Sequence, residues 1–329
     1  MLSRLAGPAG PAGFQRRLME GLQARGYDVA FGPEVGQAEA VLVIGGSRHL
    51  GALLRARRRG LPIIQRLNGI NWIHRVQPTG LRHYLRAEVN NLLLRAVRRL
   101  ADLVVYQSEF ARRWWAQAYG EASAEATIIH NAVPLDRFNP AGPESLPEDR
   151  VRLVVVEGRL AGGYQVGLEW AVDLAEGLRQ RLSRPVELVV AGQVEADARG
   201  QAGDAVTWAG VLAPEAIPGL HRSAHLFFSA DLSPACPNSV LEALACGNPV
   251  VAFDTGALPE LLTPECGRLV PYGGDPWRVE RPDLASLASA AVEVVERNQE
   301  FRQGARRQAE AAFGLDRMVA QYLAAFGWQ

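Results

Sequence analysis

The residues from Cys236 to Glu242, with the sequence CPNSVLE, could bind a phosphate-bearing ligand. Pro237, Asn238 and Ser239 lie where a loop turns into an apolar helical pattern. Asn or Ser is a preferred N-cap residue because its side-chain oxygen accepts a backbone N–H. The unpaired amides and the dipole of a helix start favour a phosphate or diphosphate and need no lysine. We therefore expect a diphosphate site at the start of this helix.

Glu242 has two interpretations. It follows Ser239 by three residues, the spacing of a capping box, in which its carboxylate would only close the helix end. Alternatively, Glu242 lies one turn into the helix and accepts hydrogen bonds from two adjacent hydroxyls of a ribose, for which a carboxylate has suitable two-oxygen geometry. The pattern alone leaves both interpretations open.

A second group of candidate side chains lies in the segment Asn68–Tyr84, between a predicted strand and a long predicted helix. The segment carries Trp72, His74, Arg75, His83 and Tyr84. Aromatic faces bind sugar rings and arginines bind acidic groups, so this composition suits a carbohydrate or an acidic acceptor. His74 is the candidate to assist an acceptor hydroxyl, and the alternative is an ordinary exposed loop histidine.

The composition excludes several classes of enzyme. All 35 cationic side chains of the 329 residues are arginine, and lysine is absent. A P-loop ATPase, a Schiff-base enzyme and a pyridoxal enzyme all need a lysine at the centre of their chemistry. The cysteines, Cys236, Cys246 and Cys266, show no paired spacing, so we expect neither a disulfide framework nor a metal site.

The charge is unevenly distributed although the net charge is zero. Residues 1–140 hold 19 Arg against 10 Asp and Glu, whereas the remainder holds 16 Arg against 25 acids. Clusters at Arg55–Arg59 and Arg95–Arg99 fall on predicted helices, where they form a solvated face or a weak peripheral contact with anionic lipid. No apolar run approaches the roughly 20 residues of a membrane helix, and no signal-peptide core is present. We expect a cytoplasmic protein, peripheral at most at the inner face of the membrane.

Alternating strands and helices must position these side chains, which predicts an α/β fold with parallel sheets. We expect N-terminal strands at 28–31, 40–44, 62–67, 103–106 and 126–129 and helices at 14–25, 49–59, 80–100 and 109–119. Further strands are expected at 152–156, 187–191, 206–208, 226–229 and 249–253 and helices at 168–182, 215–222, 239–246, 258–262, 285–295, 301–313 and 315–326. The Pro- and Gly-rich residues 141–149 read as a linker between two doubly wound domains, 1–140 and 150–314, with the final helix in 315–329 packing back on the first. Ligands of such sheets bind at the carboxyl ends of the strands, so facing domains would form the binding cleft between them.

The run CPNSVLEALACGNPVVAFDTGALPEL resembles the signature of retaining family-4 glycosyltransferases of the group 1 type. Other pieces of that family's pattern follow in its order: the Gly-rich stretch Gly7–Gly13, then VVYQSEFARRW, IIHNAVPLDRFNP, VEGRL, VVAGQV and VTWAGVL. Together they span nearly the whole chain. The resemblance implies the GT-B fold, two facing Rossmann-like domains, and transfer of a sugar from a nucleotide sugar.

The resemblance also assigns roles to individual residues. Glu242 becomes the ribose ligand, and the amides of Asn238 and Ser239 form part of the diphosphate cradle. Arg159 matches the arginine that contacts the donor phosphates, a sound role because guanidinium pairs bidentately with phosphate oxygens. Gly10 and Gly13 match the loop where the backbone approaches the donor, for which a missing Cβ is an advantage.

The sequence departs from the family at the sugar half of the donor site. The family places a second acid eight positions before the ribose glutamate, and here that position is Pro234. The nearest acid is Asp231, which could substitute only if the loop bulges. For this reason no particular donor sugar is predicted.

Two further departures concern a lysine and a histidine. Tyr164 stands where the family has a phosphate-binding lysine, which leaves Gly162 and Gly163 to offer backbone amides. Asn68 stands where a histidine is frequent and could hydrogen-bond a sugar hydroxyl or carbonyl. In a front-face retaining displacement the leaving diphosphate accepts the proton of the acceptor, so stabilisation of the leaving group dominates and neither metal nor protein nucleophile is required.

The expected function is therefore a hexosyltransferase-like enzyme with a UDP- or GDP-type nucleotide sugar as donor, no further cofactor, and a carbohydrate or lipid-linked acceptor. Two alternatives stay open: a non-catalytic relative that binds a nucleotide or sugar, and a GT-B sugar-nucleotide epimerase. The epimerase would need acid and base side chains around the sugar, and no carboxylate cluster is obvious in the sequence. Nucleic acid is not expected as a partner, because the basic half lacks interleaved aromatic and basic residues.

Overall fold

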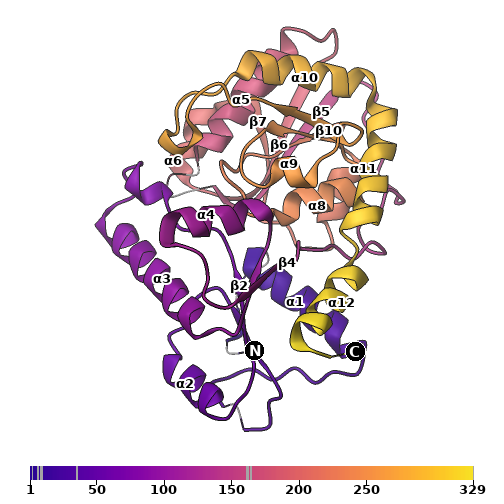
Figure 1. Ribbon diagram of the computed structural model, residues 1–329. Helices are drawn as coiled ribbons and strands as arrows, with labels where there is room; N and C mark the ends of the chain where they lie inside the picture. Colours follow the sequence, from indigo (N-terminus) through magenta and orange to yellow (C-terminus); the bar gives the residue numbers. More distant parts are fainter. Residues whose placement is uncertain are drawn as a thin grey trace. The chain divides into compact units, whose positions relative to one another are not determined.

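The computed structural model describes residues 1, 3–5, 7, 10–34, 36–160, 163 and 165–328, with only the backbone of Asp204. The described chain forms two compact units. The first comprises residues up to Ala132 together with the chain from Leu315 onward, and the second comprises Val133–Gly314. Each unit is a parallel sheet with helices packed against it (Figure 1).

The first unit is built on a four-stranded sheet with the order β1-β2-β3-β4. All neighbours in this sheet are parallel, for example β2 with β3 through Ile64 opposite Leu103. The strands are β1 (Val41–Ile44), β2 (Ile63–Leu67), β3 (Leu103–Tyr106) and β4 (Glu125–Ile128). The helices are α1 (Gly10–Gln23), α2 (Leu50–Arg58), η1 (Ile73–Arg75), α3 (Leu81–Leu100), α4 (Glu109–Tyr119) and α12 (Leu315–Phe326).

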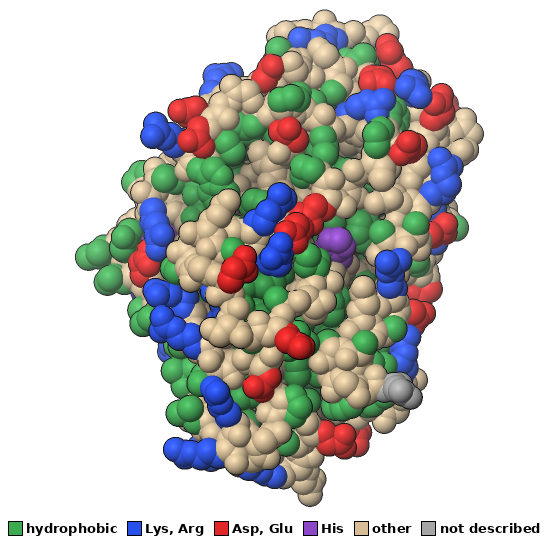
Figure 2. All heavy atoms as spheres, viewed as in Figure 1, with side chains coloured by type: hydrophobic (Ala, Val, Ile, Leu, Met, Phe, Trp, Pro, Cys, Tyr) green, Lys and Arg blue, Asp and Glu red, His purple; other side chains and the backbone are tan. Residues whose placement is uncertain are grey.

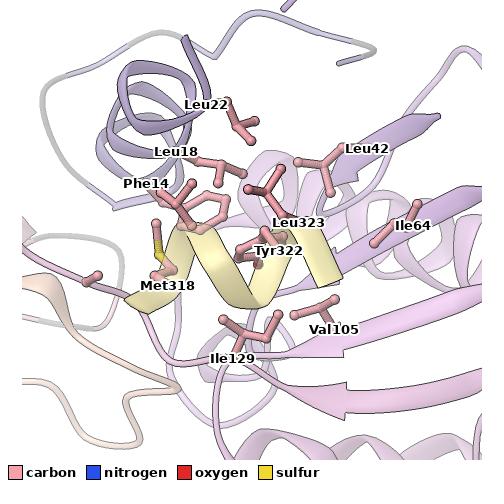
Figure 3. Close-up of a cluster of buried hydrophobic side chains, with 12 residues drawn as sticks. Phe14, Leu18, Leu22, Leu42, Ile64, Val105, Ile129, Met318, Tyr322 and Leu323 are labelled. Atoms are coloured by element: carbon pink, nitrogen blue, oxygen red, sulfur yellow. The ribbon is translucent and has the colours of Figure 1, made fainter. Parts of the chain in front are cut away.

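The core of the first unit joins residues from opposite ends of the sequence. Phe14 and Leu18 of α1 pack against Tyr322 and Met318 of α12, and the strands contribute apolar residues such as Val105 (Figure 3). The Phe14 and Tyr322 rings lie 5.5 Å apart at their centroids. α1 and α12 present their apolar faces to each other and to the sheet because burial of these faces removes apolar surface from water.

The second unit is built on a six-stranded parallel sheet with the order β10-β9-β8-β5-β6-β7. Its strands are β5 (Val151–Leu160), β6 (Val186–Val194), β7 (Val206–Gly210), β8 (Leu226–Phe228), β9 (Val250–Phe253) and β10 (Gly267–Val270). Its helices are α5 (Val166–Arg179), α6 (Ala196–Ala202), η2 (Gly203–Ala205), α7 (Ile217–Arg222), α8 (Asn238–Ala245), α9 (Leu258–Leu261), η3 (Pro276–Arg278), α10 (Leu284–Glu296) and α11 (Asn298–Ala312). The central strands are runs of buried Val, Leu and Phe, as expected for a sheet covered on both faces.

One expected element was wrong, and two observed elements were not predicted. The segment Asp28–Phe31 is not a strand; it runs beside the first residue, where the Met1 amino group donates to the Ala30 carbonyl at 2.7 Å. The strand β10 and the helix α6 were missed, because Gly267–Val270 is short and α6 buries none of its residues.

The segment expected as a linker, 141–149, belongs to the second unit. Glu144 pairs with Arg222 of α7 at 2.7 Å. In the described part of the chain, no helix has both the length and the hydropathy needed to cross a bilayer.

Candidate functional site

Several candidate residues of the second unit meet at the carboxyl edge of its sheet. β5 and β8 are neighbours in the middle of the sheet, with Leu153 opposite Leu226. The last residues of β5 and the loop from β8 to α8 therefore leave the sheet at the same edge. Ligands of open parallel sheets bind at this edge, so the residues there are the first to consider as a site.

The helix α8 begins one residue earlier than expected. Pro237 occupies the N-cap position with extended backbone, and Asn238 is the first helical residue. The expectation that Asn238 or Ser239 would be the N-cap is therefore wrong. The amides at the start of a helix point out of its end, so those of Asn238 and Ser239 could donate to an anion at the edge of the sheet.

This register also decides against the capping-box interpretation of Glu242. A capping box needs the glutamate at the third helical position, whereas Glu242 is the fifth residue of α8. Glu242 is only 8% exposed. A carboxylate at this position cannot close the helix end, which favours a binding role over a capping role.

Glu242 lies near two more carboxylates, Glu157 in the last part of β5 and Asp231 after β8. Burial, then the charge of Asp231, then that of Glu242 raise the pKa of Glu157 to about 8. Burial also raises the pKa of Asp231, although backbone N–H groups of Ser233 and Leu232 oppose this shift. Three carboxylates thus share one region at the edge of the sheet, and burial together with their mutual repulsion favours the protonated form of Glu157.

Sequence reasoning missed Glu157. Residue 157 keeps some exposure, but its Oε1 atom is buried and hydrogen-bonds to none of the described residues. Gly192 of β6 packs directly on its backbone, since a Cβ there would lie 2.0 Å from the Glu157 carbonyl oxygen. The available signal was an acidic residue, Glu157, directly after the apolar run Leu153–Val156.

Arg159 lies in β5 rather than in a loop, because the strand continues to Leu160 after an irregularity between Val156 and Arg159. Its side chain is 57% exposed and reaches Glu195, which is 60% exposed, at 3.5 Å. Exposed ion pairs of this length contribute little to stability, about 0–1 kcal/mol. Arg159 can therefore exchange Glu195 for a phosphate at small cost.

The loop that carries Asp231 is held in place through Pro234. The Ala257 amide donates to the Pro234 carbonyl at 2.8 Å. Gly256 has φ of +60°, and a Cβ on it would come within 2.6 Å of Pro234. Pro234 is buried by these contacts and fixes the loop. Its side chain has no atom that could accept a hydrogen bond from a sugar hydroxyl.

The segment after β5 is described only in part. The Gly163 amide donates to Gln165 Oε1 at 2.8 Å, so a ligand would have to displace that side chain to use it. The other two residues expected in this phosphate loop, Gly162 and Tyr164, lie outside the described residues.

The glycines expected in an N-terminal loop lie in a helix. α1 begins at Gly10, which has φ of +60°, and Gly13 is buried within its first turn. The expected start of this helix at Phe14 was therefore wrong by about one turn. Without a Cβ, Gly10 can take the left-handed conformation that starts the helix.

Asn68 follows β2 in the first unit and belongs to a buried polar network. Its side-chain oxygen accepts hydrogen bonds from Arg66 and, at 2.9 Å, from Gln107. Arg66 also donates to Asn131 Oδ1 at 2.7 Å, and Asn131 donates to Gln107 at 3.2 Å. The Asn68 oxygen is thus engaged inside the unit, and its Nδ2 amide is the part of the side chain that could donate to a ligand.

His74 is buried rather than exposed. It is 5% exposed, its Nε2 lies 2.9 Å from Glu88 Oε1, and its ring lies edge-on to Tyr84. Arg75 binds the same carboxylate through two nitrogens, at 2.7 and 3.0 Å. These contacts fit a residue that fixes the segment Asn68–Tyr84 on α3 better than one that contacts an acceptor.

No group of three or more His, Cys, Asp or Glu side chains within the described ranges is placed to hold a metal ion. The polar groups at the edge of the second sheet are carboxylates, an exposed guanidinium and the amides of a helix start. This set can bind hydroxyls and a diphosphate directly.

Comparison with known proteins places the chain among glycosyltransferase folds. Residues 151–297 match the family described as "Glycosyl transferases group 1". No curated protein matches the sequence. WaaG, a glycosyltransferase involved in lipopolysaccharide biosynthesis, is 13% identical with a TM-score of 0.69, over 99% of this chain and 98% of its own.

Two other solved structures agree. HepE of Anabaena, in complex with UDP and glucose, is 17% identical with a TM-score of 0.67, over 99% of this chain and 98% of its own. Sucrose-phosphate synthase of Thermosynechococcus elongatus is 16% identical with a TM-score of 0.68, over 98% of this chain and 82% of its own. The expected α/β fold of the GT-B type, with two parallel-sheet domains, is thereby confirmed.

Proposed function

We propose that this protein is a glycosyltransferase that moves a sugar from a nucleotide-diphosphate sugar, of the UDP or GDP type, to an acceptor hydroxyl. The observation that carries the proposal is Glu242, a buried carboxylate one turn into a helix that begins at the carboxyl edge of the sheet. The group 1 family match over residues 151–297 covers this region. HepE, of similar fold, has been solved with UDP and with UDP-glucose.

In the proposed complex the start of α8 binds the diphosphate and Glu242 binds the ribose hydroxyls. Arg159 supplies the positive charge on the phosphates. Leaving-group stabilisation of this kind acts on charge that grows in the transition state, and it needs no protein nucleophile. We therefore propose retention of the anomeric configuration and turnover without a bound metal ion, with a carbohydrate or lipid-linked acceptor.

A thermal-shift screen of UDP- and GDP-sugars tests the donor site. A ligand that binds only the folded protein stabilises it by about 2.7 kcal/mol at a concentration of 100 times its Kd. We expect one nucleotide sugar to raise the melting temperature of the wild type and of the control Glu296→Ala, an exposed residue of α10. Glu242→Ala should lose most of the shift. A wild type that responds to no nucleotide or nucleotide sugar would contradict the donor site.

Release of free nucleoside diphosphate, which depends on an added acceptor, then tests the transfer. NMR of the product gives the anomeric configuration, and turnover in EDTA reports on the metal. Binding of the donor without any release would instead indicate a non-catalytic nucleotide-sugar-binding protein.

A sugar-nucleotide epimerase is the second candidate, because the structure groups carboxylates that the sequence did not suggest. Glu157, Asp231 and Glu242 lie together, and Glu157, whose pKa is raised by burial and by the neighbouring carboxylates, could serve as an acid. Conversion of the donor sugar to its epimer without an acceptor would support this candidate. Nucleoside diphosphate release that needs an acceptor would rule against it.

A further inference from the structure

The helix α3 presents a stripe of large apolar side chains to solvent. Leu81, Leu85, Val89 and Leu92 are 75%, 56%, 48% and 59% exposed. Their spacings of four, four and three residues place them on one face of the helix. We call these four residues the α3 stripe. Single exposed apolar residues need no explanation, but a continuous row along about three helical turns marks an interaction surface.

The opposite face of α3 attaches the helix to its own unit. Leu94 and Val97 are buried, and Arg98 donates to the Gly120 carbonyl at 2.7 Å and to the Tyr106 hydroxyl at 3.2 Å. Arg98, expected to belong to a solvated or lipid-facing cluster, is therefore a structural residue. Because one face is anchored, the α3 stripe is a second apolar face, beyond what the core of the unit requires.

Arginines border the stripe. Arg82 and Arg86 are exposed on one side of it, and Arg99 is exposed at the far end of the helix. The single acidic residue of α3, Glu88, is bound by Arg75 and His74 and its pKa is lowered to about 2, so its charge is compensated. In Figure 2, hydrophobic side chains protrude at the left edge, where Figure 1 shows α3, with basic side chains next to them.

We propose that the α3 stripe docks on an anionic lipid surface, with α3 lying parallel to the membrane. The leucines and the valine enter the boundary between headgroups and acyl chains, and the bordering arginines bind lipid phosphates. Arginine suits this position because its long aliphatic stem can follow the apolar surface while its guanidinium stays at the headgroups. The proposal does not depend on the proposed transfer reaction.

Charge and chemistry argue against a second copy of this chain, and against nucleic acid, as the partner of the α3 stripe. In a symmetric dimer across the stripe, the arginine border of one copy would approach the same border of its partner, and like charges repel. Nucleic acid would meet the arginines, but a row of aliphatic side chains offers nothing to phosphates and little stacking to bases. An anionic bilayer has an apolar interior, which matches the α3 stripe, and negative headgroups, which match the bordering arginines.

Co-sedimentation of the full-length protein with vesicles tests the proposal. The vesicles contain phosphatidylcholine alone or a mixture with phosphatidylglycerol. We expect wild-type protein to bind the mixed vesicles, and the double variant Leu85→Glu/Leu92→Glu to lose about ten-fold or more of the bound fraction. Leu54→Glu is the matched control, because Leu54 is 44% exposed on α2, outside the stripe.

Further measurements test the contribution of charge and check that the variants fold. Arg82→Gln/Arg86→Gln should weaken binding to mixed vesicles several-fold, and added salt should weaken wild-type binding in the same way. Circular dichroism melting checks that each variant folds. Wild-type protein that binds neither vesicle type would overturn the proposal. The proposal would also be overturned if the Leu85→Glu/Leu92→Glu variant bound vesicles normally, or if these substitutions changed only the oligomeric state, from dimer to monomer. Glu242→Ala should bind vesicles as the wild type does, so failure of the donor site would remain distinguishable.

Discussion

The side chain of Glu157, in the last part of β5, lies close enough to Asp231, after β8, for their charges to interact. Burial first, and the negative charge of Asp231 second, raise the pKa of Glu157 to about 8. The residues are 74 positions apart and meet only because β5 and β8 are neighbours in the sheet. This relationship leads to the first two predictions.

The contribution of Glu157 to stability should fall as pH rises between about 4.5 and 8. The folded-state pKa of Glu157 is raised from 4.5 to about 8, so in this interval the unfolded state releases a proton that the folded state keeps. The contribution of Glu157 is then complete below pH 4.5, decreases by at most about 1.4 kcal/mol per pH unit, and levels off above pH 8. Urea unfolding of the wild type and Glu157→Gln across this range should give curves whose difference has this slope. Parallel curves would contradict the assignment.

Binding of a nucleoside diphosphate should weaken above pH 8 in the wild type. Ionisation of Glu157 adds a negative charge beside the site, and this charge repels the diphosphate. Glu157→Gln keeps a neutral polar side chain of similar size, so its affinity should change little between pH 7 and 9. Isothermal titration calorimetry with UDP and GDP gives both affinities. An equal decrease of affinity in the wild type and in Glu157→Gln would mean that ionisation of Glu157 is not its cause.

Replacement of Arg159 by Gln should weaken nucleoside diphosphate binding without unfolding the protein. A charge-assisted hydrogen bond contributes about 1.5–3 kcal/mol, which corresponds to roughly ten- to 100-fold in Kd. The charge pair that this removes among the described residues is an exposed one, with Glu195, so the melting temperature should shift little. Glu195→Gln is the matched control and should bind the diphosphate at least as well as the wild type. Equal losses in the two variants would argue against a phosphate contact.

Gly256→Ala should destabilise the second unit and disturb the loop that carries Asp231. Gly256 has φ of +60°, and a Cβ would come within 2.6 Å of Pro234. Gly60→Ala is the control, because Gly60 has φ of +71° with nothing within 4 Å of the added Cβ. The control should cost about 1–2 kcal/mol for backbone strain alone, and Gly256→Ala clearly more. Chemical unfolding measures both, and equal costs would mean that the contact with Pro234 is unimportant.

Arg66→Met should destabilise the first unit by about 2–5 kcal/mol. Arg66 is 2% exposed and donates hydrogen bonds to Asn68 and Asn131. Its guanidinium carbon Cζ lies 3.8 Å from the centroid of the Phe14 ring. Its removal leaves buried oxygens without their charged donor. The exposed Arg57 provides the control Arg57→Met, which should change stability by less than about 0.5 kcal/mol. A similar small effect at Arg66 would contradict the role of the network.

Most strands and helices could be predicted from the sequence because they follow strong apolar periodicity, as in the buried runs of β5 and β9. The start of α8 could not be fixed, since both Pro237 and Asn238 fit a helix entry and only the backbone decides between them. The wrong assignment at Asp28–Phe31 has a different cause: Val29 packs on the core, but the segment does not join the sheet.

The candidate site could be predicted from the sequence only where its residues are close together along the chain. Asn238, Ser239 and Glu242 lie on one helix, so their relation follows from helical geometry. Glu157 depends on strand order, which the sequence does not reveal. The burial of His74 likewise depends on Glu88, which lies 14 residues away on α3.

The position of α12 affects how the chain can be made. The first unit includes residues up to Ala132 and the chain from Leu315 onward, with the whole second unit between them. During synthesis, α1 and the first sheet leave the ribosome well before α12, which must supply Met318 and Tyr322 to their core. The second unit is contiguous and can fold while the first waits with an open apolar face. A nascent chain of this protein therefore needs protection longest at its oldest end, the reverse of the order in which domains usually complete folding.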